Sequence, residues 1–416
     1  MNKIIKNFKN IKYGPAPEDD TEVINWIKKI SSSNKNYING KWNTSKGSKK
    51  IKVINPSTNK KLFDLTISTK KDVDLAVYSA RKAQKKWSSI SAFQRSKYLY
   101  ALARLIQKHS RFLAVLESID NGKPIRETRD IDIPLVARHF YYHAGWAEKL
   151  DKNLKPIGVV GQIIPWNFPL LMLAWKIAPA IACGNTVVLK PAEYTSLTAL
   201  YFAELCIKAN IPNGVINIIT GDGSTGELIT SHPEIQKIAF TGSTEIGKKI
   251  IQSTSSTNKK LTMELGGKSP FIVFEDADLD SAVEGVVDAI WFNQGQVCCA
   301  GSRLLIQESI EKKFIKKLKQ RMEKLRIGNP LDKSIDIGAI VAPVQLQKIN
   351  SLVKKGIKDG AKLWQPSWSC PTEGLFYPPS LFTNVTPASF IAQVEIFGPV
   401  LTSLTFRKPS EAVAIA

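Results

Sequence analysis

Cysteine and histidine are scarce in this chain of 416 residues, and it has no long uninterrupted apolar run. Its five cysteines are an odd number, and Cys298 and Cys299 are adjacent, so a disulfide framework fits poorly and a reducing compartment is expected. The most apolar stretch, residues 169–189, contains Lys176 and Pro179, which argues against a membrane span. The N-terminus has no apolar core of the kind that a secretory signal needs. The sequence therefore predicts a cytoplasmic location.

Acidic residues are also few: 36 aspartates and glutamates stand against 58 lysines and arginines, a net charge of +22. The lysines are scattered from Lys3 to Lys408, without an arginine-rich arm or an aromatic RNA-binding pattern. This distribution favours a solvated surface over a nucleic-acid partner. With 43% apolar and 23% charged residues, the composition is that of a folded protein, and the length suggests two or three domains of about 150 residues.

Apolar residues recur at helical spacing from Asp72, and again from Leu99 to Ile106, which predicts two amphipathic helices. Short runs rich in β-branched residues then alternate with helical segments. These runs span residues 158–165, 186–190, 215–220 and 237–242. The alternation predicts an α/β fold with a parallel sheet, which binds a nucleotide at the carboxyl ends of its strands.

A second alternating block is expected to begin near Leu261 and to form another α/β domain. Its elements are strands at 271–274 and 303–307, a helix at 280–292 and a lysine-rich helix beyond Ser309. The polar segment 253–260 is expected to join the two blocks.

Two glycine-containing turns are candidate phosphate sites. Gly221, Gly223 and Gly226 have the G-x-G-x-x-G spacing after a strand, and Glu245 is placed to bind a ribose. The nucleotide fingerprint belongs after the first strand of such a unit, and this copy follows the third, so an ordinary glycine turn explains it equally well. Ser243, in FTGSTEIG, is a potential N-cap at a strand-to-helix junction, where a helix N-terminus can bind a pyrophosphate.

Lys190 and Glu193 follow the run TVVLK at the expected mouth of the sheet. A cation and a carboxylate there could hydrogen-bond the hydroxyls of a ribose. A surface ion pair accounts for the same residues equally well. The residues alone leave both interpretations open.

The strongest local cluster is NQGQVCCAGSR, residues 293–303, where a helix ends in a polar turn. A free thiol has a pKa of about 8.5, so a nucleophilic cysteine needs a site that stabilises its anion, and a polar turn could supply one. Glu264 at a strand end could act as a base, and Asn167 in PWNFP could donate to an oxyanion. An inert thiol, a solvated carboxylate and a turn amide are the alternatives, and chemistry alone does not choose between Cys298 and Cys299.

The sequence resembles the aldehyde dehydrogenase superfamily over nearly its whole length, from YINGKW at residues 37–42 to EIFGPV at 395–400. Between them, GQIIPWNFP, GNTVVLKPAE, FTGSTEIG, MELGGK and FNQGQVCCAGSR occur in the family's order and spacing. The resemblance implies an aldehyde dehydrogenase-like α/β fold, with a Rossmann-like parallel-sheet NAD-binding domain and an α/β catalytic domain. It also implies NAD(P)-dependent oxidation of an aldehyde to a carboxylic acid, with no metal required.

By this resemblance Cys298, two residues after Gln296, is the nucleophile and Cys299 is a bystander. In the family mechanism the thiolate adds to the aldehyde carbon, and the Asn167 side chain and the Cys298 backbone N–H hold the oxyanion. Hydride leaves to the nicotinamide, and Glu264 activates the water that hydrolyses the resulting thioester.

The resemblance also assigns cofactor contacts along the chain. Glu193, beside the adenosine ribose, would repel a 2′-phosphate and favours NAD, although Lys190 could accept NADP as well. The expected contacts are Ile164, Pro165, Trp166, Lys190, Glu193, Gly223, Phe240, Gly242, Ser243, Leu265, Glu395 and Phe397.

Two departures from the family pattern indicate a particular branch. Only residues 147–157 connect the AGW helix to the next strand, where tetrameric members insert a bridging β-hairpin, so a shortened oligomerisation hairpin is expected. The chain also stops at Ala416, soon after EIFGPV. Together with YGPAPE at 13–18 and YYHAGWAEKL at 141–150, these features look most like the sixteenth aldehyde dehydrogenase family.

This interpretation divides the chain into three parts. They are an NAD-binding domain at 1–133 and 157–263, a shortened bridging segment at 134–156, and a catalytic domain at 264–416 that is incomplete at its C-terminus. A homodimer is expected in place of the bridged tetramer, with a small-molecule aldehyde as substrate and no nucleic acid or membrane as partner. The alternative is a catalytically incomplete or non-catalytic aldehyde dehydrogenase-like protein that serves in binding or assembly.

Overall fold

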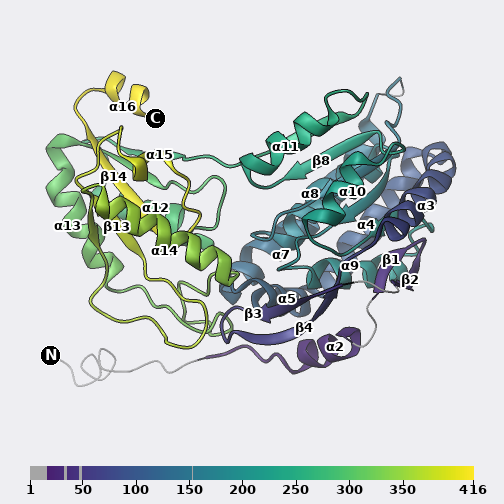
Figure 1. Cartoon of the computed structure of the whole chain (residues 1–416), viewed down its shortest axis with the longest axis horizontal. Coiled ribbons are helices and arrows are strands. Elements are labelled where there is room, and N and C mark those ends of the chain that lie inside the picture. Colours follow the sequence, from purple (N-terminus) through teal and green to yellow (C-terminus); the bar gives the residue numbers. More distant parts are fainter. Residues whose placement is uncertain (1–15, 32–34, 46–48, 152) are drawn as a thin grey trace.

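The computed structural model describes residues 16–31, 35–45, 49–151 and 153–416, and it has two lobes (Figure 1). The first lobe, coloured purple to teal, is built on a seven-stranded sheet, and the second, green to yellow, on a five-stranded sheet. The predicted α/β fold class is confirmed.

The seven-stranded sheet has the order β2-β1-β7-β6-β5-β8-β9. Strands β7, β6, β5, β8 and β9 run parallel, and the hairpin β1-β2 adds two antiparallel strands at one edge. The bounds are β1 Lys35–Ile38, β2 Lys41–Thr44, β5 Val159–Ile163, β6 Thr186–Lys190, β7 Ile216–Ile218, β8 Lys237–Thr241 and β9 Lys260–Glu264.

Helices cover both faces of this sheet. Alternate residues of a strand point to opposite faces, and here the side chains on both faces are apolar and are buried by helices. Along β6, Val187 and Leu189 join one hydrophobic cluster and Val188 joins another. The first face is covered by α4 Ala92–Lys108, α5 Ser110–Asn121, α7 Ile133–Lys149, α8 Pro169–Ala182 and α9 Leu197–Lys208. The second face is covered by α3 Lys70–Ser89, α10 Gly223–Ser231 and α11 Thr244–Thr254.

Smaller elements extend this lobe. The antiparallel hairpin β3-β4 lies below the sheet beside α2, and a short π-helix, η1, links α6 to α7 (Figure 1). The bounds are α2 Thr21–Ser31, β3 Lys50–Asn55, β4 Lys60–Thr66, α6 Ile125–Glu127 and η1 Thr128–Asp132.

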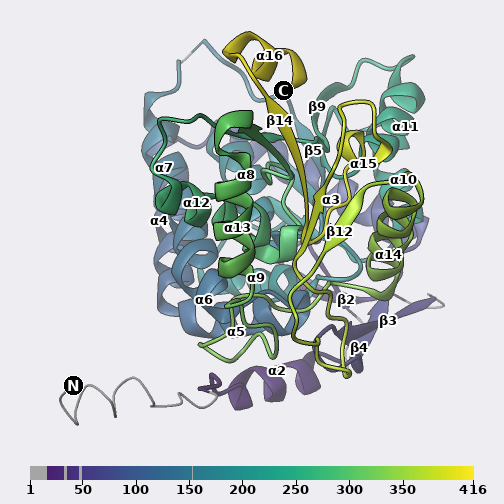
Figure 2. The ribbon, with the colours of Figure 1, turned by 90° about the vertical axis from the view of Figure 1, so that its left-hand side faces the viewer.

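The five-stranded sheet has the order β10-β11-β14-β13-β12, with only β12 antiparallel. Leu304 packs with α12 and α13 on one face, and Leu305 packs with α14 and α15 on the other, so this sheet too is covered on both sides (Figure 2). The bounds are β10 Pro270–Val273, α12 Leu279–Trp291, η2 Phe292–Gly295, β11 Arg303–Gln307, η3 Glu308–Ile310, α13 Glu311–Met322, α14 Pro343–Lys358, β12 Lys362–Trp364, β13 Ser380–Thr383, α15 Phe390–Gln393, β14 Val400–Phe406 and α16 Pro409–Ile415.

The predicted helices and strands form, but the start of the second block near Leu261 was wrong. The strand that begins near Leu261 is β9, and it pairs with β8 at the edge of the first sheet. The second block therefore begins with β10. The segment 253–260 is not a linker between the blocks, because it contains the end of α11 and the turn that leads into β9.

The connection between α7 and β5 is short. Its described residues, 150–151 and 153–158, form no strand, as expected from the shortened hairpin. In the N-terminal motif YGPAPE, Tyr13, Gly14 and Pro15 lie outside the described residues. Among the described residues, no helix is both long enough and apolar enough to cross a membrane.

Candidate active site

The expected site residues gather where the parallel strands of the first sheet end. In the strand register Ile163 pairs with Lys190 and with Phe240, and Thr241 pairs with Glu264. The carboxyl ends of these four neighbouring strands therefore lie side by side. The loops that follow these strands carry Asn167, Glu193, Ser243 and Leu265. Parallel strands place such loops side by side, which is why residues far apart in the sequence meet here.

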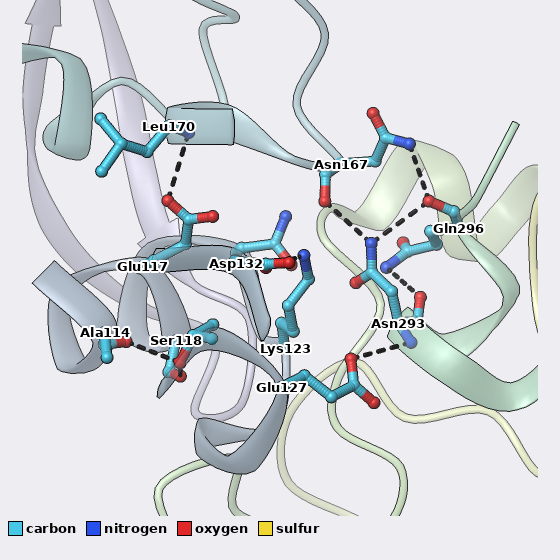
Figure 3. A network of polar contacts seen from close by, with 12 residues as sticks. Ala114, Glu117, Ser118, Lys123, Glu127, Asp132, Asn167, Leu170, Asn293 and Gln296 are labelled. Atoms are coloured by element: carbon cyan, nitrogen blue, oxygen red, sulfur yellow. Dashed lines mark hydrogen bonds and ion pairs between the residues drawn. The ribbon is translucent and has the colours of Figure 1, made fainter. Parts of the chain in front are cut away.

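Asn167 lies in the loop between β5 and α8 and is 4% exposed. Its Nδ2 donates to the backbone oxygen of Gln296 at 2.8 Å, across the boundary between the two lobes (Figure 3). Two side chains of α5 hold the loop, because Asn121 donates to the Trp166 oxygen at 2.7 Å and the Glu117 carboxyl accepts from the Leu170 N–H at 3.2 Å. The amide is thus fixed against the turn that leads to Cys298.

Cys298 follows η2 in a turn whose backbone is unusual. Asn293, Gln294 and Gly295 have φ values of 48°, 55° and 71°. A Cβ at Gly295 would lie 2.1 Å from the Gly398 oxygen, so only glycine fits there. The Cys298 side chain is exposed, yet partial burial raises the pKa of its thiol, and Cys299 adds to the increase. Backbone N–H groups of Cys298 and Cys299 favour the thiolate and oppose this increase in pKa, but burial outweighs them.

Glu264 is the last residue of β9, and it is exposed. Its backbone oxygen accepts from the Gly242 N–H at 3.1 Å, which joins the ends of β8 and β9. The loop beyond it approaches the nucleophile turn, since a Cβ at Gly267 would lie 4.0 Å from the Cys298 oxygen. Burial lowers the pKa of Lys176 to about 8, and the nearby Glu264 carboxylate opposes this shift.

Lys190 is buried, at 4% exposure, so its pair with Glu193 is not an exposed surface ion pair. Its Nζ donates to the oxygens of Gly221 at 2.9 Å and Pro191 at 3.1 Å, and it lies 3.5 Å from a Glu193 carboxylate oxygen. Burial lowers the pKa of this ammonium, and Glu193 opposes the change. A buried cation and a half-buried carboxylate therefore stand at the carboxyl end of β6.

Ser243 is the N-cap of α11, as predicted, and its hydroxyl accepts from the Ile246 N–H at 3.3 Å. Phe240, Gly242 and Leu265 complete this corner. A Cβ at Gly242 would lie 2.5 Å from the Phe240 ring, and one at Gly247 would lie 2.4 Å from the Leu265 side chain. Leu265 thus packs on the first turns of α11.

Gly223 opens α10, which follows β7, the third of the parallel strands in chain order. The G-x-G-x-x-G copy therefore stands where the sequence indicated, away from the first strand. Among the described residues, nothing lies within 4 Å of a Cβ built at Gly223, so this turn borders open space.

Glu395 and Phe397 reach the same place from the second lobe. The Phe397 ring meets the Trp166 ring edge to face at 5.1 Å, and Pro165 and Ile164 precede Trp166 in the loop after β5. A Cβ at Gly266 would lie 2.1 Å from a Glu395 carboxylate oxygen, so this carboxyl rests on the glycine backbone beyond Glu264. Burial raises the pKa of Glu395.

Comparisons with known proteins agree with this arrangement. The sequence profile of the Aldehyde dehydrogenase family matches residues 42–416. The chain belongs to the aldehyde dehydrogenase family. It is 43% identical to aldehyde dehydrogenase family 2 member B4, mitochondrial, of Arabidopsis thaliana, over 97% of this chain and 78% of that protein. It is also 43% identical to human retinal dehydrogenase 2, over 96% of this chain and 79% of the relative.

Solved aldehyde dehydrogenases share the fold. The NAD+ complex of an aldehyde dehydrogenase from Bacillus cereus superposes with a TM-score of 0.91 and 37% identity, covering 96% of this chain and 84% of that one. In the present chain the residues at the lobe boundary fit a dinucleotide. Lys190 supplies a buried cation at a strand end, and Glu395 Oε1 is a buried oxygen without a hydrogen-bond partner among the described residues.

Sequence reasoning missed two residues of this site. Asn293 belongs to the NQGQVCC cluster, but nothing in the pattern gave it a role; its Nδ2 donates to the Asn167 oxygen at 2.8 Å and to the Gln296 oxygen at 3.2 Å. Glu127, from α6, accepts from the Asn293 N–H at 2.9 Å (Figure 3). The left-handed backbone at residue 293 suits asparagine, which is the only signal that could have marked it.

Proposed function

We propose that this chain oxidises an aldehyde to a carboxylic acid with NAD, using Cys298 as nucleophile, Glu264 as base and Asn167 as oxyanion donor. The observation that carries the proposal is the hydrogen bond from Asn167 Nδ2 to the Gln296 oxygen, which places the amide beside the turn that ends at Cys298. Glu264, at the end of β9 in the same sheet, completes the set of groups that thioester chemistry requires.

The first step is bond formation at sulfur. Burial raises the pKa of the Cys298 thiol, so the thiol must first lose its proton, and because the side chain is exposed this proton goes to solvent. The sulfur then bonds to the aldehyde carbon, and the carbonyl oxygen becomes an oxyanion. One N–H of the Asn167 amide already donates to the Gln296 backbone oxygen. The second N–H, together with the Cys298 backbone N–H, is therefore free to donate to the oxyanion.

The second half of the reaction resets the thiol. When bound, the oxidised nicotinamide accepts the hydride that leaves the former aldehyde carbon. Loss of this hydride converts the sulfur adduct into a thioester. Glu264 next takes a proton from water, the water oxygen bonds to the thioester carbon, and the carbon–sulfur bond breaks. The carboxylic acid departs, and Glu264 passes the proton it took from water to the Cys298 sulfur, which resets both groups.

The cofactor would be held from both lobes. Lys190 and Glu193 would take the adenosine ribose, Ser243 the pyrophosphate, and Glu395 and Phe397 the nicotinamide half. The Glu193 carboxylate beside Lys190 favours NAD over NADP, since a 2′-phosphate would meet a negative charge.

Three finer assignments stay predictions. The short connection after α7 supports membership of the sixteenth family and a homodimer without the bridging hairpin. The few, unpaired cysteines support a cytoplasmic location. A non-catalytic binding protein is the alternative function, and the presence of Cys298, Glu264 and Asn167 at one lobe boundary argues against it.

The test is NADH formation, followed by near-ultraviolet absorbance with NAD and a panel of short, long and aromatic aldehydes. We expect Cys298→Ala to abolish turnover while NAD still binds, and Cys299→Ala, the matched control, to keep it. Glu264→Gln should let the acyl-enzyme accumulate, which mass spectrometry of the intact chain detects. Turnover by Cys298→Ala, or none by the parent chain although it binds NAD, would contradict the proposal.

A further inference from the structure

Two carbonyl groups of the candidate site are held by one side chain. Asn293 Nδ2 donates to the backbone oxygen of Asn167 at 2.8 Å and to that of Gln296 at 3.2 Å. The Gln296 oxygen is also the acceptor of the Asn167 side chain. Asn293 therefore closes a ring of hydrogen bonds between the loop of Asn167 and the turn of Cys298, as Figure 3 shows.

Asn293 is itself held in place by hydrogen bonds of its backbone. It has no exposed surface, and its backbone N–H donates to Glu127, whose side chain is also buried. Its backbone oxygen accepts from the Gln296 backbone N–H at 2.9 Å and from the Gln296 side chain at 3.3 Å. With φ at 48°, the backbone of Asn293 directs its N–H to Glu127 and its side chain to Asn167.

We propose that Asn293 is a positioning residue for oxyanion stabilisation, and that Glu127 anchors it. This inference rests on the proposed function, because it takes Asn167 as the oxyanion donor and Cys298 as the nucleophile. Both partners of Nδ2 are carbonyl oxygens, so a carboxylate or an alkyl group at residue 293 would remove this donor from the Asn167 oxygen and leave the Gln296 oxygen with the Asn167 amide alone.

The expected consequence is selective. Without the Asn293 amide, the Asn167 loop and the Cys298 turn lose their shared donor, and the free N–H of Asn167 is no longer fixed where the oxyanion forms. Reactions of Cys298 that develop no oxyanion do not depend on that N–H. Alkylation of the thiol by iodoacetamide is such a reaction.

The test uses Asn293→Gly, because glycine keeps the left-handed backbone and removes only the side chain. The matched control is Asn210→Gly, at an exposed residue with φ of 52° in the connection between α9 and β7. Both are made in a Cys299→Ala background, so that alkylation reports Cys298 alone at this turn. We expect Asn293→Gly to lower aldehyde oxidation about tenfold or more and to change the alkylation rate of Cys298 less than about twofold.

Three other outcomes overturn the inference. Unchanged oxidation by Asn293→Gly, with Cys298→Ala inactive, would leave the proposed function intact and refute the role of Asn293. Equal losses of oxidation and alkylation would indicate a general displacement of the turn. Loss of oxidation in Asn210→Gly as well would show that the substitution acts through folding. If Cys298→Ala is active, the proposed function itself fails.

Glu127 provides a second variant that does not alter Asn293. Glu127→Gln keeps an oxygen that can accept from the Asn293 N–H, whereas Glu127→Ala removes it. We expect the glutamine variant to retain at least about five times the oxidation rate of the alanine variant, at equal NAD affinity. Equal rates in the two variants would remove Glu127 from the inference.

Discussion

Next to the site, three buried carboxyl groups share one buried ammonium group, that of Lys123. Lys123 pairs with Asp132, and Glu117 and Glu127 lie in the same cluster (Figure 3). Burial raises the pKa of Glu127 to about 8, an effect that Asp132 reinforces and that Lys123 and Arg126 oppose. Because one cation cannot balance three charges in an apolar surrounding, Glu127 carries its proton at neutral pH.

This raised pKa makes stability depend on pH in a defined direction. The unfolded chain loses the Glu127 proton near 4.5, and the folded chain keeps it to about 8. Between these values the folded state binds more protons, so Glu127 makes the free energy of unfolding fall as pH rises. Glu127→Gln removes this dependence. We expect its unfolding free energy, relative to the parent chain, to rise between pH 5 and pH 8 by at most about 1.4 kcal/mol per pH unit.

Urea unfolding at several pH values measures this difference. Glu245→Gln is the control, because Glu245 is exposed and forms an ion pair with Lys249 across one helical turn. A difference between Glu127→Gln and the parent chain that stays constant over this range, or that falls, would show that Glu127 is ionised in the folded protein.

Burial explains why the sequence indicated some site residues and missed others. Cys298, Glu264 and Asn167 stand in motifs that resemble a known family, and the structure brings their loops to one boundary. Glu127 follows an arginine on a short polar segment, which is typical of a solvated turn. Only the packing of α6 against the turn of residue 293, distant in the sequence, buries it. No local pattern records such a contact.

At the scale of elements, the close approach of η2 to the segment before β14 depends on Gly295. Its φ is 71°, and a Cβ would lie 2.1 Å from the Gly398 backbone oxygen. Gly360 has a similar φ of 94°, but among the described residues nothing lies within 4 Å of its Cβ position. We expect Gly360→Ala to cost about 1–2 kcal/mol of stability for the backbone conformation alone. Gly295→Ala should cost about 1–3 kcal/mol more, because the backbone cannot move aside as a side chain could.

Urea unfolding and NADH formation together test this expectation. Gly295→Ala should lose oxidation activity in the fraction that stays folded, since the turn that carries Cys298 must shift, and Gly360→Ala should keep it. Equal losses of stability in the two variants would show that the turn yields to the added methyl group without strain.

Strand membership was the part of the fold that sequence could not settle. The runs LTMEL and PFIV are both short and apolar, and each forms a strand as predicted. Which sheet a strand joins depends on pairing with distant partners, here β8 for β9 and β11 for β10. The polar segment 253–260 has the composition of a linker as much as of a helix end and turn. The start of the second block near Leu261 was therefore misplaced, although both runs form strands.

At the scale of the whole molecule, two lysines at opposite ends of the parallel strands, one buried and one half-buried, allow a matched comparison. Lys190 stands at the carboxyl end of β6, facing the second lobe, and its Nζ donates to the oxygens of Pro191 and Gly221. Lys259 precedes β9, at the amino ends of the strands of the same sheet. Its Nζ likewise donates to two backbone oxygens, those of His232 and Ile235. The two lysines make similar hydrogen bonds, so substituting each with methionine separates cofactor binding from the local cost of losing an ammonium.

We expect NAD to stabilise the parent chain and Lys259→Met by the same amount, about 2.7 kcal/mol at a concentration 100 times the Kd. Lys190→Met should lose most of this stabilisation, because the cofactor binds where the parallel strands end. Thermal unfolding of each variant with and without NAD measures the gain against the variant's own baseline, so any destabilisation by the substitution cancels. Equal stabilisation by NAD in both variants would remove Lys190 from the cofactor site. A loss of stabilisation confined to Lys259→Met would place that site at the amino ends of the strands.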